Sequence, residues 1–218
     1  MNQKYILTGG ASIGNANATY PFADLFVDKD VLKINASIIG NLVFQSKDVI
    51  SIDSYTNGIR INHCVENYNS KIIFWTTKNP DIVINEIEKT GFLDNKSISE
   101  NYDVSVILRR QKEGSFPIKK TVAIIFGIIW NLLFLYDFIP FFLNLNNKSD
   151  RLPIGIGITS AVGFLFVCSI LALFSKHFRN IILKESRDLN DIRKFTYLIA
   201  LVSGIILATI TIVKNLIE

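Results

Sequence analysis

The sequence has few of the residues that build disulfide frameworks or metal centres. Its 218 residues include two cysteines and two histidines. Cys64 lies in a polar segment and Cys168 inside a long apolar run, so the two thiols should not meet. His63 and His177 are too few and too far apart in the sequence to indicate a zinc site. We therefore expect no disulfide, no metal ion and no other cofactor.

A nucleotide-binding loop is also missing, although TGGASIG (residues 8–14) looks like the opening of a short-chain dehydrogenase. That pattern is roughly TGxxxGxG, and this stretch is one glycine short. A Walker A loop would need Lys and then Ser or Thr where Asn15 and Ala16 stand. The residues that follow have no helical apolar period and include Pro21. We interpret the stretch as a flexible lead-in to the first strand.

No pair or triad of side chains indicates catalysis, so we expect no enzyme. Asp53 and Glu66 have no carboxylate partner at a defined spacing, and no hydrolase triad is visible. Arg60 and His63 fall on opposite faces of one predicted strand, because side chains three residues apart alternate. We expect His63 to be partly buried and hydrogen-bonded and Arg60 to be a surface charge, and we keep both as possible functional residues.

Hydrophobic residues make up 49% of the chain and are unevenly placed. Residues 1–97 carry a net charge of −1, and residues 98–218 carry +5. The basic residues flank apolar runs, which indicates membrane topology and not a nucleic-acid partner. Three runs have the length of about 20 residues that a bilayer requires, and they cover residues 121–143, 153–174 and 195–213.

Lysine and arginine are concentrated before the first span and between the second and third spans. The positive-inside rule therefore places the N-terminal domain and the 175–194 loop in the cytoplasm. The 144–152 loop and the C-terminus should lie outside. We expect a multi-pass protein of a bacterial inner membrane.

Two polar residues lie inside the first span. Asp137 sits among aromatic residues toward the outer end of the span, where it could reach the interface, bond to another helix or act in a proton relay. Asn131 lies near the centre and should form an interhelical hydrogen bond. A small oligomeric transporter or channel that uses Asp137 is the alternative function.

Small residues recur at four-residue spacing in the second and third spans. Such residues let helix backbones approach closely in lipid, either within the three-helix unit or between copies of a homo-oligomer. The predicted packing residues are Gly155, Thr159, Gly163, Ala200, Gly204 and Ala208.

The soluble half alternates apolar and polar residues from Phe22 onward, which predicts six or so antiparallel strands. The strongest hairpin signal is DVISIDSYTNGIRINHC, in which Asn57 and Gly58 should supply the positive φ angles of a tight turn. NPDIVINEIEKTGFL then predicts one helix, with Asn79 as its N-cap and Gly91 as its stop. Aromatic residues such as Tyr68 and Trp75 could line a peptide groove, although core packing is the commoner role.

Strands that meander into a small barrel closed by one C-terminal helix resemble pleckstrin-homology-like (PH-like) domains. The stretch at residues 58–92 resembles a bacterial family of uncharacterised membrane-attached proteins with such a domain. The positions that carry the resemblance are Gly58, Ile59, Ile61, His63, Phe74, Trp75, Asn79, Pro80, Gly91 and Phe92. The resemblance implies a binding or scaffolding module without a reaction. The first hairpin turn, at residues 28–30, is net acidic and unlike the basic loop of lipid-binding members.

The predicted fold class is therefore α+β: a PH-like domain over residues 1–97, a connector at 98–120, in which residues 103–110 could add a strand, and three transmembrane helices over 121–218. The predicted function is a membrane-tethered module that recruits a protein or lipid partner at the cytoplasmic face of the bilayer. Strand addition at the open edge of the sheet is one way to bind such a partner.

Overall fold

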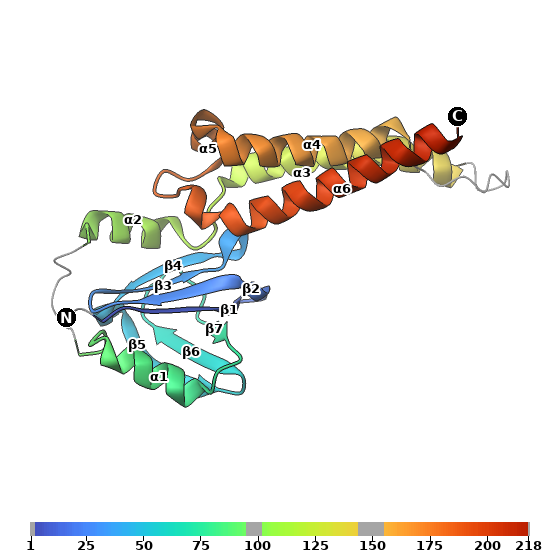
Figure 1. The fold of residues 1–218 in the computed structure, drawn as a ribbon. Helices are drawn as coiled ribbons and strands as arrows, with labels where there is room; N and C mark the ends of the chain where they lie inside the picture. The colour runs from blue at the N-terminus through green and yellow to red at the C-terminus, as the bar shows by residue number, and fades with distance from the viewer. Residues whose placement is uncertain (1–2, 95–101, 144–154, 218) are drawn as a thin grey trace. The chain divides into compact units, whose positions relative to one another are not determined.

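The computed structural model describes residues 3–94, 102–143 and 155–217. The chain divides into two compact units (Figure 1). One holds residues 1–117 together with residues 184–192, and the other holds residues 118–183 and 193–218. The first unit thus extends beyond the predicted domain of residues 1–97, and it includes part of the loop between the second and third apolar segments.

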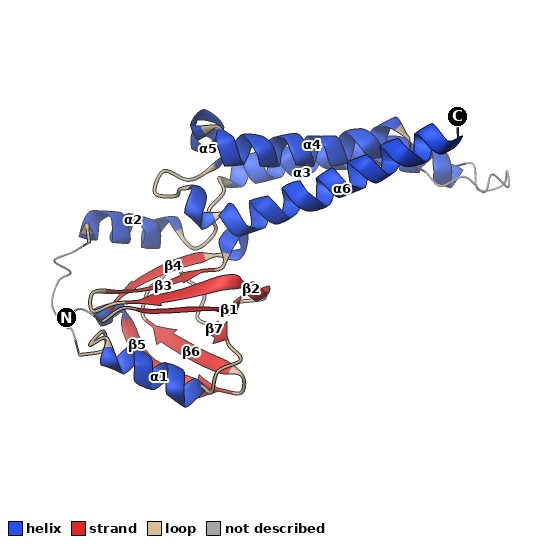
Figure 2. Ribbon diagram, in the orientation of Figure 1, coloured by secondary structure: helices blue, strands red, loops and turns tan. Residues whose placement is uncertain are grey.

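The first unit contains one curled antiparallel sheet of seven strands in the order β4-β3-β2-β1-β7-β6-β5 (Figure 2). The strands are β1 (Tyr5–Ile13), β2 (Ala16–Val27), β3 (Val31–Asn35), β4 (Asn41–Gln45), β5 (Val49–Tyr55), β6 (Gly58–His63) and β7 (Ile72–Trp75). Short 3-10 helices precede and follow β4, at Ser37–Ile39 and Ser46–Asp48. The observed α+β class agrees with the sequence, and the strands outnumber the expected six by one.

The stretch TGGASIG lies in β1 and is not a flexible lead-in. Strand β1 pairs with β2 along one edge and with β7 along the other, and Gly14 forms the turn to β2 with a φ of +62°. Leu7, Ala11 and Ile13 alternate into the core. The prediction was wrong because glycine and alanine are weak strand formers on their own, whereas pairing on both sides holds them extended.

Inward side chains of the strands form one core, which includes Leu25, Phe44 and Phe74. Helix α1 (Pro80–Lys89) contributes Val83 and Ile87 to the same core. As predicted, the helix begins at Asn79, whose Oδ1 accepts a hydrogen bond from the backbone N–H of Asp81 at 2.8 Å. The positive φ of Gly91, +73°, follows its C-terminal end.

Strands β5 and β6 form the predicted hairpin, but with a different turn. Tyr55 pairs with Gly58, so Thr56 and Asn57 form the connection, and none of the turn residues has a positive φ. Gly58 is instead the first residue of β6, where its missing side chain lets the strand approach β7. The glycine therefore serves packing and not turn conformation.

The stretch 103–110, a possible extra strand from the sequence, does not form one: residues 104–113 form helix α2 (Val104–Glu113). Ile107 of α2 packs against Val31 and Val43, which point away from the main core. Asp103 caps the helix by accepting from the backbone N–H of Ser105 at 2.8 Å. The segment at 184–192, with a 3-10 helix at Leu189–Asp191, completes this unit.

The second unit consists of α3 (Lys120–Leu143), α4 (Ile156–Phe174), α5 (Lys176–Ile182) and α6 (Arg193–Ile217). By length and composition α3, α4 and α6 are able to cross a bilayer, as the sequence predicts. Helix α4 packs against both α3 and α6. The expected outer loop at 144–152 and the C-terminal residue lie outside the described residues.

Candidate functional site

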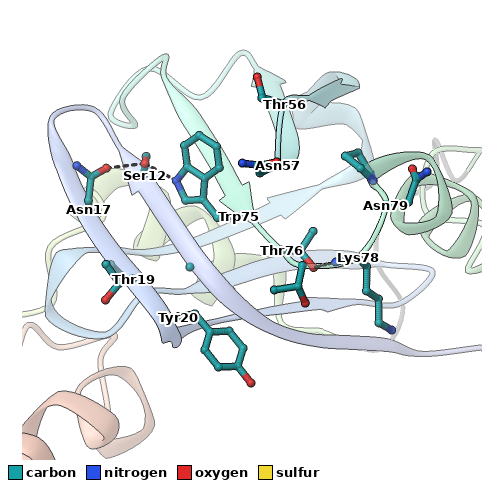
Figure 3. A pocket seen from close by; sticks show the side chains of 14 residues that line it. Ser12, Asn17, Thr19, Tyr20, Thr56, Asn57, Trp75, Thr76, Lys78 and Asn79 are labelled. Carbon is teal, nitrogen blue, oxygen red and sulfur yellow. Dashed lines mark hydrogen bonds between the residues drawn. The ribbon is translucent and has the colours of Figure 1, made fainter.

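A pocket opens on the outer face of the sheet in the first unit (Figure 3). It has a volume of about 950 Å³ and lies among the β1–β2 hairpin, the β5–β6 turn and the connection from β7 to α1. Ser12 and Trp75 form its floor, and Gly10 of β1 also lines it. The rim residues are Asn17, Ala18, Thr19, Tyr20, Thr56, Asn57, Thr76, Thr77, Lys78, Asn79 and Pro80.

A hydrogen-bonded chain fixes the orientation of Trp75. Its indole Nε1 donates to Ser12 Oγ at 2.6 Å, and Ser12 Oγ donates to Asn17 Oδ1 at 2.5 Å. The ring of Tyr55 meets the indole edge to face, with 5.6 Å between the ring centroids. Because Trp75 is held from two sides before any ligand arrives, ordering it on binding costs little entropy.

An irregularity in β2 builds one rim of the pocket. Pairing shifts between Gly9–Ala23 and Ala11–Ala18, so residues 19–22 of β2 stand opposite Gly10 alone. Such bulges re-aim side chains in a sheet. Here the bulge leaves Tyr20 with 65% of its surface exposed at the rim.

The opposite rim follows the chain from β7 into α1. The backbone N–H of Thr76 donates to Asn57 O at 2.9 Å, which ties this connection to the β5–β6 turn. Thr76 Oγ1 accepts from the backbone N–H of Lys78 at 3.1 Å. The ammonium of Lys78 lies 5.8 Å from the ring centroid of Tyr5. Both rims are thus held by bonds within the unit.

The lining of the pocket is almost uncharged. Most of its exposed surface is apolar, its polar groups are mainly hydroxyls and amides, Lys78 is the one basic residue, and no carboxylate takes part. Such a surface offers neutral hydrogen-bond donors and acceptors around an aromatic floor, which suits binding of an uncharged ligand.

His63 and Arg60 lie outside this pocket. The Nδ1 atom of His63 accepts from the backbone N–H of Val65 at 3.1 Å, and Nε2 lies 2.9 Å from Asn69 O, so both ring nitrogens are engaged. Its ring packs 5.3 Å from that of Phe44. Arg60 is exposed on β6. As the sequence predicts, His63 is partly buried and hydrogen-bonded and Arg60 is a surface charge. Neither residue lines the Trp75 pocket.

Of the two aromatic residues considered for a peptide groove, Tyr68 lies in the core and Trp75 lines the pocket. Tyr68 is 6% exposed and belongs to the core, where its hydroxyl accepts from the backbone N–H of Val43 at 3.3 Å. Trp75 lines the pocket. The sequence could not separate the two, because the bulge that opens the pocket has no local signal besides Pro21.

Asp137 reaches from α3 to the beginning of α4. Its Oδ2 accepts from the backbone N–H groups of Gly155 at 3.0 Å and Ile158 at 2.7 Å. A carboxylate in this position satisfies amides that lack partners within their own helix. We expected Asn131 to form a hydrogen bond to another helix, and this prediction was wrong. Its Nδ2 donates instead to Gly127 O, one turn earlier in α3, at 2.7 Å.

The small residues that are buried on α4 differ from the predicted ones. Gly157, Ala161 and Ser169 are buried, whereas Gly155, Thr159 and Gly163 are half-buried, although a Cβ added at Gly155 would lie 2.5 Å from Asp137 Oδ1. A Cβ added at Gly163 would meet nothing within 4 Å. On α6, a Cβ at Gly204 would lie 3.2 Å from the Phe166 ring, whereas Ala200 is half-buried and Ala208 exposed. Spacing alone cannot tell which face of a wholly apolar helix meets a neighbour.

A buried charge network joins residues 184–192 to the rest of the first unit. The guanidinium of Arg110 on α2 binds both carboxylate oxygens of Asp191, at 3.3 and 3.2 Å. Arg187, whose side chain is fully buried, donates to Asn41 O at 3.1 Å and to Gly114 O at 2.6 Å. Burial raises the pKa of Asp191 although the two guanidiniums oppose the shift, and burial lowers the pKa of Arg187.

The two edges of the sheet differ in how open they are. Side chains and loops cover the outer side of β4: Gln111 Nε2 donates to Val43 O at 3.1 Å, and the backbone N–H of Asn41 donates to Ser115 O at 2.9 Å. Among the described residues strand β5 pairs with β6 alone, but a bulge at Ile50 interrupts its register. Strand addition therefore has at most the short run 51–55 available.

The described residues contain no cluster of three His, Cys, Asp or Glu side chains that could hold a metal ion. No protein-family model, curated protein or solved structure gives a significant match to the chain.

Proposed function

We propose that this protein is a membrane-tethered binding module that holds an uncharged segment of a protein partner in the Trp75 pocket. The observation that carries the proposal is the pocket itself, with an aromatic floor fixed by Ser12 and Asn17 and rims of neutral hydrogen-bonding groups. Tryptophan and tyrosine are the residues that most often anchor protein interfaces, because they bury a large area with few rotatable bonds.

The charge of the lining favours a peptide over a lipid headgroup. Phosphate recognition needs several arginine or lysine side chains or free amides at a helix N-terminus. The pocket supplies Lys78 alone, and the first turn of α1 is already capped by Asn79. A neutral peptide segment needs no such charges.

We also propose that the sheet and α1 form a PH-like domain. Support comes from the antiparallel meander of β1 to β4, the pairing of β1 with β7, and a helix that directly follows the last strand and shares the core. PH-like domains act as binding modules, which agrees with the pocket around Trp75.

The membrane helices would hold this module at a bilayer. Since residues 184–192 belong to the same unit as residues 3–94, both segments would lie on one side of any membrane that α4 and α6 cross. The lysine and arginine bias makes that side the cytoplasm, at a bacterial inner membrane. The alternative function is transport through Asp137. The described residues give it no support, because capping of α4 already gives this carboxylate a structural role.

Site-specific photo-crosslinking tests the proposal. A photoreactive amino acid replaces Tyr20 or Thr56, which lie on opposite rims of the pocket, in the full-length protein in its native membrane. We expect both positions to capture the same protein, and Trp75→Ala to abolish capture by removing the floor. Capture that persists in Trp75→Ala, or different proteins at the two rims, would contradict the proposal.

Ile50 is the matched control position. It is 73% exposed and lies at the far end of β5 from the β5–β6 turn, so it should capture little. Crosslinks from Ile50 with none from Tyr20 would point to strand addition at the β5 edge instead.

A further inference from the structure

Asn131 is a polar residue at the centre of the first apolar helix and on its outer surface. Helix α3 runs from Lys120 to Leu143, which puts Asn131 at its midpoint. The side chain is exposed, and α4 is the helix against which α3 packs. In a bilayer, a carboxamide at this depth would face hydrocarbon and not water.

The hydrogen bond within α3 satisfies only part of this amide. Nδ2 gives one of its two protons to Gly127 O, and the described structure gives the second proton and the Oδ1 acceptor no partner. A polar group without a partner is costly in hydrocarbon, so membrane helices pair such groups across an interface. A partner on this exposed face of α3 should therefore both donate a hydrogen bond to Oδ1 and accept one from Nδ2 of Asn131.

The surroundings of Asn131 fit a second helix. Ile124, Ile128 and Leu135 are 62%, 55% and 43% exposed, and with Asn131 they follow alternating spacings of four and three residues. That spacing forms a continuous seam between two helices that wind around each other. A Cβ added at Gly127 would meet nothing within 4 Å, so the turn beside Asn131 is open.

We propose that this seam is the interface with a second copy of the chain, in which two α3 helices pair around a twofold axis through Asn131. At such an axis each residue meets its own copy. A carboxamide is complementary to itself, because the free N–H of one Asn131 donates to Oδ1 of the other and the reverse bond forms equally. No acid, base or second residue type is required. The proposal rests on α3 crossing a membrane, which is part of the proposed function, but not on what the Trp75 pocket binds.

Disulfide crosslinking in membranes locates the interface. In a full-length chain with Cys64→Ser and Cys168→Ala, single cysteines are placed at Ile124, Ile128 and Leu135 on the seam. Ile129→Cys and Tyr136→Cys are the controls, because at about 100° per residue they lie more than about 100° around α3 from the centre of the seam, and they are 38% and 69% exposed. We expect dimers at the seam positions in several-fold excess over the controls. Equal yields at all five positions, or none, would overturn the proposal.

The contribution of the amide is measured separately. Energy transfer between labelled copies in lipid vesicles should show that Asn131→Leu weakens association by about 5- to 30-fold, while Ile129→Ala, away from the seam, changes it little. Unchanged association of Asn131→Leu would overturn the pairing, as would a different membrane protein occupying the seam. A chain that is absent from the membrane fraction would overturn the membrane premise, whereas capture at Tyr20 would still report on the pocket.

Discussion

Gly9 and Gly58 face β7 from its two sides, and neither position has room for a side chain. A Cβ at Gly9 would lie 2.2 Å from the carbonyl oxygen of Trp75, and a Cβ at Gly58 would lie 2.0 Å from that of Phe74. Both distances are far below van der Waals contact. The two glycines thus let β1 and β6 close on β7, the strand that carries the pocket floor.

Gly58→Ala should destabilise the first unit by about 3 kcal/mol or more, because the methyl group would collide with backbone that cannot move without breaking the sheet. Thermal unfolding of the full-length protein, followed by the near-ultraviolet signal of its tryptophans, measures the change. Gly163→Ala is the matched control in a position with free space. A Gly58→Ala protein that melts with the wild type would contradict this account of the glycine.

The glycines also show where sequence reasoning stops at the residue scale. Gly9 and Gly58 were read as a mobile segment and a turn, which are the usual local roles of glycine. Their actual role depends on the carbonyl groups of Phe74 and Trp75, which lie far along the chain. No pattern within a few residues reports on such a neighbour.

At the scale of elements, capping separates what was predictable from what was not. Asn79 caps the helix that it precedes, so the residue order alone reveals it. Asp137 caps α4 from the preceding helix, 18 residues before Gly155. The sequence could show an acid in an apolar span but not that its partners are backbone amides.

Asp137→Ala should destabilise the start of α4 by about 0.5 to 2 kcal/mol, the usual value of an N-cap. Hydrogen exchange of the protein in lipid vesicles would show faster exchange at the first amides of α4. In Asp137→Asn the remaining oxygen still accepts a hydrogen bond, so the effect should be smaller. If neither variant changes exchange in α4, the carboxylate does not act as its cap.

At the scale of the whole molecule, the loop between the second and third apolar segments differs from its predicted role, because residues 184–192 belong to the first unit. Arg187 and Asp191 lie four apart in a basic loop between two apolar runs, where sequence rules predict charges at a membrane surface. Both are buried in the first unit instead. The three apolar helices and most hairpins follow from composition and periodicity, whereas this return of the chain depends on contacts with α2 and β4, more than 70 residues away.

Asp191→Ala should destabilise the network by about 3 to 5 kcal/mol, because it leaves the buried guanidinium of Arg187 and the partly buried guanidinium of Arg110 without this acid. Hydrogen exchange should increase in β3, β4 and α2, and much less in β6 and β7. Glu185→Gln is the control: it removes the exposed pair with Arg109, which contributes at most about 1 kcal/mol. Equal effects of the two substitutions would show that the network is not structural.

The same return of the chain sets an order of events during synthesis. A ribosome that has made residues 1–117 has made every strand of the sheet but not Arg187, which covers Asn41 on the edge strand β4. Helices α3, α4 and α5 must be made first. The sheet therefore reaches its final form only after α3, α4 and α5 have been made, so a chain truncated before residue 184 would leave the Asn41 carbonyl on β4 without the guanidinium of Arg187.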